Sequence, residues 1–151
     1  MNLKNITFLL IFYFLSACGY QALNLQKNLN YSILNYNLKG DNQVNKILAR
    51  NFEKYKNLNN INSIEILSNT KVNKSESVRD TSGKAISYNL NIIIDITVIK
   101  NGIEITKKLF NKKTNYDNLA SQFELKQYEK ILINDLVEQM INDINYFLSN
   151  I

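Results

Sequence analysis

Apolar and polar residues alternate along several segments of the chain, which is the pattern of β-strands with one buried face. The longest of these segments is 87–100, where every second side chain from Tyr88 to Val98 is apolar. Shorter alternations occupy 31–38 and 63–72. We therefore expect a strand in each of the three segments.

The first of these strands has an imperfect period of two. Strict alternation places Tyr31, Ile33 and Asn35 on one face of the strand, and Leu34, Tyr36 and Leu38 on the other. Gly40 then interrupts the pattern, as expected at the end of a strand.

The dipeptide Asn101-Gly102 follows the longest strand and predicts a tight hairpin, because type I′ turns need positive φ at both central residues. Segment 103–116 is expected to return as the antiparallel partner strand. Its alternation slips in phase between Ile105 and Phe110, so we expect a bulge near Lys107-Lys108.

Two other segments repeat apolar residues every three or four positions, the period of a helix with one buried face. The first follows Gly40, and Asp41 or Asn42 can cap it. The second begins at Ser121, whose spacing to Glu124 has the form of a capping box. If this helix continues to the last residue, it spans roughly 45 Å and must lie along the whole sheet or overhang it. The expected apolar stripe of the first helix is Val44, Ile47, Leu48, Phe52 and Tyr55.

The predicted element order is β-α-β-β-β-α, within a single domain that covers residues 31–151. This order predicts an α+β fold, a two-layer sandwich in which two helices lie on one face of a four-stranded, mostly antiparallel sheet. The polar segment 73–85 separates two of the strands, and its sequence suits either a long hairpin tip or a mobile loop.

The N-terminus has the three parts of a secretory signal peptide. Lys4 precedes the uncharged, apolar segment 6–15, and small residues follow. The apolar run is too short to cross a bilayer, which takes about 20 residues. Residues 15–18 read Leu-Ser-Ala-Cys, and they match the lipobox of bacterial lipoproteins. We therefore expect cleavage after residue 17, with 18–30 forming a short lipidated tether.

Cys18 is the only cysteine in the chain, and it stands where lipoprotein maturation uses a thiol. It is expected to carry a diacylglyceryl thioether and an N-acyl chain. Two or three acyl chains anchor a protein stably where one does not. Gly19 follows, rather than the Asp that resembles an inner-membrane retention signal. We therefore expect attachment to the outer membrane, on its periplasmic face.

Composition excludes several functions. The chain has 26 Asn, 20 Ile and 16 Lys but no His, so its Lys content reflects a general bias and is weak evidence of function. Without His and with one Cys, it has neither the usual zinc ligands nor a histidine-dependent catalytic triad. Its carboxylates are scattered, and we expect no enzymatic activity, no metal and no cofactor beyond the lipid. The sequence lacks a basic stripe interleaved with aromatic residues, which is the pattern that would indicate nucleic-acid binding. We therefore expect no nucleic-acid partner.

The chain has only two Arg, and one of them, Arg79, lies in the polar segment 73–85 with Lys74 and Lys84. The planar guanidinium offers a fork of donors that suits phosphate. A solvated loop charge is the simpler interpretation of the same residue. These three cations are the candidate ligand-binding residues of the sequence.

The lipobox, the start Cys18-Gly19-Tyr20 of the mature chain, the element order and the long C-terminal helix together resemble the LptE family of outer-membrane lipopolysaccharide-assembly lipoproteins. Alphaproteobacterial members are the most similar. An Arg before their central strand and a Tyr early in it look like Arg79 and Tyr88. The chain departs from them at Ala22, where they often have Pro.

The resemblance implies a non-enzymatic role as plug and folding partner inside an LptD-like outer-membrane β-barrel. It also implies contact with lipopolysaccharide, for which Arg79, Lys74 and Lys84 are the candidate residues. The alternative is a peripheral lipoprotein that scaffolds or activates a cell-envelope enzyme, such as a peptidoglycan synthase. Such a protein needs a long linker to reach across the periplasm, whereas the tether here has about a dozen residues.

Overall fold

The computed structural model describes residues 31–56 and 62–151, so the predicted signal peptide, Cys18 and the tether lie outside the described residues. The observed element order is the predicted β-α-β-β-β-α, with one added turn of 3-10 helix, η1, after the first helix. The elements are β1 (Ser32–Gly40), α2 (Asn42–Phe52), η1 (Glu53–Tyr55), β2 (Ser63–Arg79), β3 (Ala85–Lys100), β4 (Ile103–Asp117) and α3 (Gln122–Leu148).

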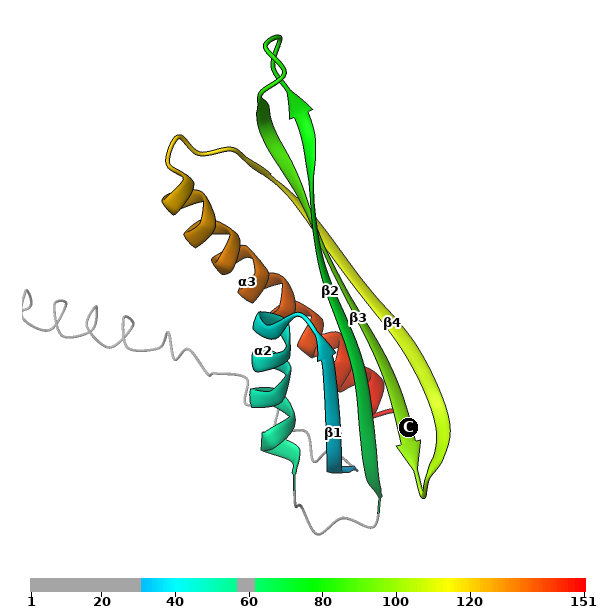
Figure 1. Ribbon diagram of the computed structural model, residues 1–151. Coiled ribbons are helices and arrows are strands. Elements are labelled where there is room, and N and C mark those ends of the chain that lie inside the picture. Colours follow the sequence, from blue (N-terminus) through cyan, green and yellow to red (C-terminus); the bar gives the residue numbers. More distant parts are fainter. Residues whose placement is uncertain (1–30, 57–61) are drawn as a thin grey trace, which may run out of the picture.

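The four strands form one sheet in the order β1-β2-β3-β4. β1 runs parallel to β2, while the β2–β3 and β3–β4 pairs are antiparallel. Both helices lie on the same face of the sheet, and no described element covers the other face (Figure 1). The predicted two-layer α+β sandwich, with a mostly antiparallel sheet, is thus confirmed.

The core lies between the sheet and the two helices. Alternate residues of β3 from Leu90 to Val98 are buried, as the alternation predicted. On the helix side, the buried residues include Leu48 of α2 and Met140 of α3. α3 ends at Leu148, three residues before the end expected from its apolar stripe.

The segment left open between hairpin and loop is a hairpin. β2 and β3 remain paired as far as Arg79 and Ala85, and the chain turns through residues 80–84. This tip extends beyond the end of β4 (Figure 1). It lies at the opposite end of the sheet from Tyr31, where the described part of the chain begins.

The predicted faces of β1 are wrong because the strand contains a bulge. Ile33 pairs with Ile64, but the next register pair is Asn35 with Glu65, so Leu34 is the extra residue. Its side chain is 60% exposed. The extra residue reverses the alternation, and Tyr36 and Leu38 therefore pack against the core on the same side as Ile33.

The connection from β1 to α2 depends on Gly40. This residue has a φ of +99°, and its backbone lies against that of Thr70 on β2. Asp41 then caps α2, because its carboxylate accepts hydrogen bonds from the backbone N–H groups of Gln43 (2.9 Å) and Val44 (3.0 Å). The chain therefore reverses direction within two residues.

The hairpin between β3 and β4 has the predicted turn, with φ of 52° at Asn101 and 76° at Gly102. The bulge expected near Lys107-Lys108 lies instead at Ile105. Val98 pairs with Thr106 and Ile99 pairs with Glu104, which leaves Ile105 without a partner in the register. The sequence shows that the alternation slips in phase, but the position of the extra residue is set by how β4 pairs with β3.

Candidate functional site

The hairpin tip, which carries two of the three candidate cations, is organised around Asp80. Its Oδ1 accepts hydrogen bonds from the hydroxyl of Ser82 (2.7 Å) and from the backbone N–H groups of Ser82 and Lys84 (both 2.9 Å). These bonds, led by the Ser82 hydroxyl, lower the pKa of the Asp80 carboxyl. The tip is thus an ordered turn that holds a carboxylate beside Lys84.

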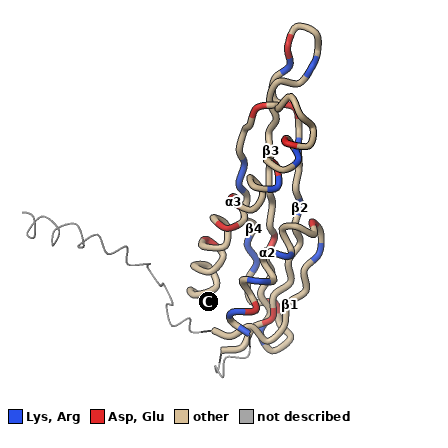
Figure 2. Tube along the Cα trace, turned by 90° about the vertical axis from the view of Figure 1, so that its left-hand side faces the viewer, with Lys and Arg blue, Asp and Glu red and all other residues tan. Residues whose placement is uncertain are grey.

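Arg79 lies in the tip with part of its donor fork already in use. Its guanidinium forms an ion pair with Glu76 and donates a hydrogen bond to the carbonyl of Gly83 (3.3 Å). Positive and negative residues therefore alternate in the tip, as the blue and red segments at the top of Figure 2 show. A phosphate that approaches Arg79 competes with a carboxylate for the guanidinium.

Lys74 does not join the other two cations, because it lies five residues before Arg79 on β2. Its ammonium lies 3.9 Å from the ring centroid of Tyr88 and 2.5 Å from Oε1 of Glu129 on α3. Lys74 thus connects the sheet to the helix. Of the three predicted residues, the structure brings only Arg79 and Lys84 together in the tip.

An aromatic cluster surrounds the contact between Lys74 and Glu129. Tyr116 on β4 donates a hydrogen bond to the same Glu129 oxygen (2.7 Å). Its ring stacks on Tyr88 (centroids 5.6 Å apart) and meets Tyr128 of α3 edge-on (6.1 Å). Burial, followed by the bond to Glu129, raises the pKa of the Tyr116 hydroxyl. The cluster attaches the first half of α3 to the strands.

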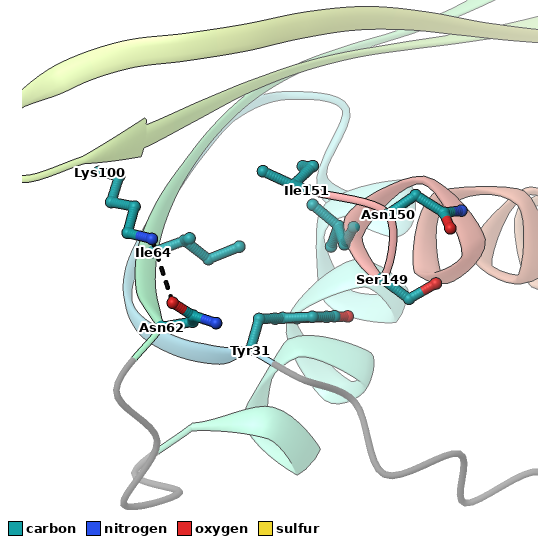
Figure 3. A pocket seen from close by; sticks show the side chains of 8 residues that line it. Tyr31, Asn62, Ile64, Lys100, Ser149, Asn150 and Ile151 are labelled. Carbon is teal, nitrogen blue, oxygen red and sulfur yellow. Dashed lines mark hydrogen bonds between the residues drawn. The ribbon is translucent and has the colours of Figure 1, made fainter.

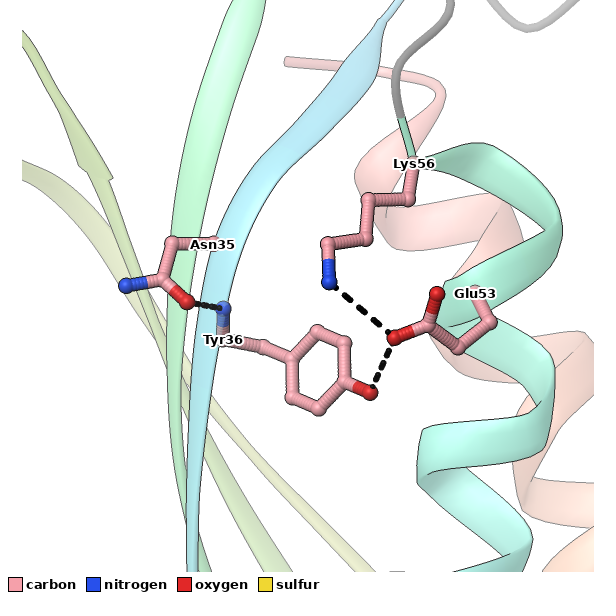
Figure 4. Close-up of polar contacts among 4 residues, drawn as sticks. All are labelled: Asn35, Tyr36, Glu53 and Lys56. Atoms are coloured by element: carbon pink, nitrogen blue, oxygen red, sulfur yellow. Dashed lines mark hydrogen bonds and ion pairs between the residues drawn. The ribbon is translucent and has the colours of Figure 1, made fainter.

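A second polar contact holds η1 against β1 (Figure 4). Tyr36 donates a hydrogen bond to Oε1 of Glu53 (2.6 Å), and the ammonium of Lys56 lies 3.2 Å from the same oxygen. These contacts lower the pKa of Glu53, chiefly through Tyr36, and the same bond raises the pKa of Tyr36. The geometry is that of a structural clamp between two neighbouring elements.

A cleft of about 330 Å³ lies at the end of the fold where the described chain begins. Figure 3 shows its side chains, which come from the residue before β1, the start of β2, the end of β3 and the C-terminal end of α3 with the residues after it. Lys100 donates a hydrogen bond to Oδ1 of Asn62 across one side (3.2 Å). Tyr31 is 4% exposed, and its hydroxyl has no hydrogen-bond partner among the described residues. The sequence did not indicate this cleft, because its walls come from segments far apart in the chain.

Two further features are absent from the described part of the chain. Among residues 31–56 and 62–151, no group of three acidic, His or Cys side chains could hold a metal ion. Within the same ranges, no helix combines the length and apolar character needed to cross a bilayer.

Comparison with known proteins shows where this fold occurs. Rare lipoprotein B from Shewanella oneidensis superposes with a TM-score of 0.53 at 11% identity, over 77% of this chain and 97% of that one. A minor lipoprotein from Acinetobacter baumannii superposes with a TM-score of 0.53 at 16% identity, over 77% of this chain and 92% of that one. Uncharacterized lipoprotein B from Nitrosomonas europaea superposes with a TM-score of 0.55 at 14% identity, over 80% of this chain and 88% of that one.

The chain therefore has a fold that is found in solved bacterial lipoproteins. At these identities the similarity shows the fold alone. No family model and no curated protein matches the sequence.

Proposed function

We propose that this chain is a lipoprotein of the bacterial outer membrane that acts as plug and folding partner of an LptD-like β-barrel and contacts lipopolysaccharide. The observation that carries the proposal is the coincidence of two independent features. The chain has a lipobox ending at its only cysteine, Cys18, and its domain has the fold of solved bacterial lipoproteins. The proposed role is binding and assembly, without enzymatic activity and without a metal or cofactor other than the lipid.

The shape of the domain supports a role inside a barrel. β2 has 17 residues, and a strand of that length spans roughly 55 Å, more than the hydrocarbon thickness of a bilayer, which is about 30 Å. The uncovered face of the sheet carries amide side chains, among them Asn69, Asn91 and Asn111. Neutral polar groups of this kind suit the polar interior of an outer-membrane barrel.

The tether supports a partner close to the membrane. Residues 19–30 separate the expected lipid on Cys18 from Tyr31, the first residue of the core. Fully extended, this segment spans at most about 40 Å. The alternative partner, a peptidoglycan synthase or similar envelope enzyme, would have to lie within that reach.

Affinity purification of the full lipidated chain tests the proposal. We expect a large outer-membrane β-barrel to co-purify after mild detergent extraction, and barrel assembly to fall when the chain is depleted. Co-purification of a periplasmic synthase without any barrel would contradict the proposal and favour the alternative.

The tip is the proposed contact for lipopolysaccharide phosphate. We expect Arg79→Ala to weaken binding of lipopolysaccharide to the purified full chain by roughly tenfold, because a guanidinium–phosphate contact contributes about 1.5–3 kcal/mol and each 1.4 kcal/mol is a factor of ten. Arg50→Ala, on an exposed position of α2, is the matched control. Barrel co-purification should survive in both variants. Unchanged lipopolysaccharide binding in Arg79→Ala would refute the assignment of the tip.

A further inference from the structure

A groove runs between the edge strand β4 and the C-terminal half of α3, far from the hairpin tip. It consists of two adjoining hollows of about 400 and 330 Å³, which share Lys108 and Tyr146. Along β4 the lining extends from Thr106 to Lys112, a length of roughly 20 Å. We call this the β4–α3 groove. Its lower end shares Asn150 and Ile151 with the cleft at Tyr31.

Aromatic and aliphatic residues make up about half of the groove lining. Phe110 and Phe147 meet edge-on, with ring centroids 5.8 Å apart, and Met140 lies in the upper hollow. Tyr146 lines both hollows and is 66% exposed. An apolar strip that is open to solvent suits a flexible hydrocarbon chain.

Positive charge lies directly over this apolar lining. The ammonium of Lys108 is 5.2 Å from the ring centroids of both Phe110 and Phe147. Among residues 31–56 and 62–151, no carboxylate lies within ion-pairing distance of Lys108. Lys112 also faces the groove, where it pairs with Asp143 at 3.4 Å. The basic segments along β4 are visible in Figure 2.

Lys108 in the groove and Arg79 in the tip thus differ in their partners. Arg79 is paired with Glu76, whereas the ammonium of Lys108 lies over two aromatic rings and has no ion-pair partner among the described residues. An ammonium that is held over rings without a counter-ion is available to an anionic group at the groove. Charge and apolar surface together select an anionic amphiphile.

We propose that the β4–α3 groove binds one acyl chain of a phosphorylated glycolipid, with a phosphate of its headgroup against Lys108. The polar groups that line the groove favour a glycolipid over a simple phospholipid, because the amide of Asn150 and the hydroxyl of Thr106 can bond to sugar hydroxyls. This inference extends the proposed function, and it rests on that function for the choice of lipopolysaccharide as the source of the glycolipid. It adds a binding site separate from the tip.

Photo-crosslinking of the full lipidated chain tests the groove. The chain, carrying Tyr146→benzoylphenylalanine, is placed in phosphatidylcholine nanodiscs that contain either lipid A or phosphatidylglycerol at equal phosphate. We expect an adduct with lipid A, and we expect Lys108→Ala in this background to reduce its yield by about tenfold. Lys113→Ala removes the same charge from an exposed position of β4 outside the groove lining and should leave the yield unchanged.

Each other outcome overturns the inference. An adduct with phosphatidylcholine alone, or with the chain's own lipid, would show that the groove takes hydrocarbon without selecting a phosphate. Equal adducts with lipid A and phosphatidylglycerol would refute the glycolipid source. Equal yields from Lys108→Ala and Lys113→Ala would refute the role of Lys108, and a matching thermal unfolding profile would show that both variants are folded. No barrel is present, so failure here is distinct from failure of the barrel partnership.

Discussion

Gly40→Ala is expected to lower the free energy of unfolding by roughly 3 kcal/mol or more, which is a large part of the stability of a domain of this size. A Cβ at this position would lie 1.9 Å from the carbonyl oxygen of Thr70, which belongs to the backbone of the neighbouring strand. The φ of +99° adds a conformational cost of about 1–2 kcal/mol for any L side chain. Relief requires β1 to move away from β2.

The neighbourhood of Gly40 leaves little room for such a movement. The Thr70 hydroxyl lies within hydrogen-bond distance of two acceptors, the carbonyl of Lys39 (3.1 Å) and the side-chain oxygen of Asn45 (2.9 Å), which share its single hydrogen. The backbone N–H of Asp41 donates to the Thr70 carbonyl (3.3 Å). Separation of the strands at this point therefore also loses the bonds that position the start of α2.

Gly83→Ala is the matched control for this prediction. Gly83 also has a positive φ, +83°, but nothing lies within 4 Å of an added Cβ. Its substitution should therefore show the conformational cost alone, about 1–2 kcal/mol. Urea denaturation followed by circular dichroism measures both variants. Equal losses of stability in the two would contradict the close approach of Gly40 to Thr70.

Cys18→Ala is expected to abolish membrane anchoring of the mature chain, because no thiol remains for the diacylglyceryl group. Each buried methylene contributes about 0.8 kcal/mol to membrane binding, so the loss of two or three acyl chains releases the domain. The variant should be found either soluble in the periplasm or as the longer chain with its signal peptide uncleaved. Cell fractionation with mass determination separates these two forms.

Ser16→Ala keeps a small residue before the cysteine and serves as the control for lipidation. It should be cleaved, acylated and recovered with the outer membrane, as for the unmodified chain. Recovery of cleaved Cys18→Ala in the outer-membrane fraction would refute lipidation at this position. Recovery of the unmodified chain in the inner membrane would refute the localisation expected from Gly19.

Most of the fold could be predicted because its signals are local. The alternation in β3 reports a strand with one buried face, and its even-numbered residues from Leu90 to Val98 are indeed the buried ones. Asn101-Gly102 specifies its turn through the φ values of those two residues alone. The helical stripe beginning at Val44 and the cap at Asp41 likewise depend on neighbours within a few positions.

The positions of the two bulges could not be predicted from the local pattern alone. At Leu34 and at Ile105, the extra residue is defined by how the strand aligns with a partner that is distant in sequence or across the hairpin. A slip in alternation signals that a bulge exists, but pairing chooses its position. The face of the residues that follow, such as Tyr36, depends on that choice.

The surroundings of the cations also could not be predicted from local sequence. Sequence proximity grouped Lys74 with Arg79 and Lys84, yet Lys74 pairs with Glu129, 55 residues away. The sequence predicted only a bulge near Lys108, and the packing of α3 against β4 places its ammonium over two aromatic rings. Electrostatic environment depends on distances in space, to which residue spacing is a poor guide.

The order of elements, the turn chemistry and the capping of the helices can be derived from the chain as written, because each follows from interactions within a few residues. The lipobox at Cys18 is likewise predicted from a short local motif. The register of the strands, the carboxylate that each cation meets, and the β4–α3 groove depend on how distant segments pack. Those contacts arise when the helices close over one face of the sheet, because burial of the apolar faces brings together side chains that no local pattern relates.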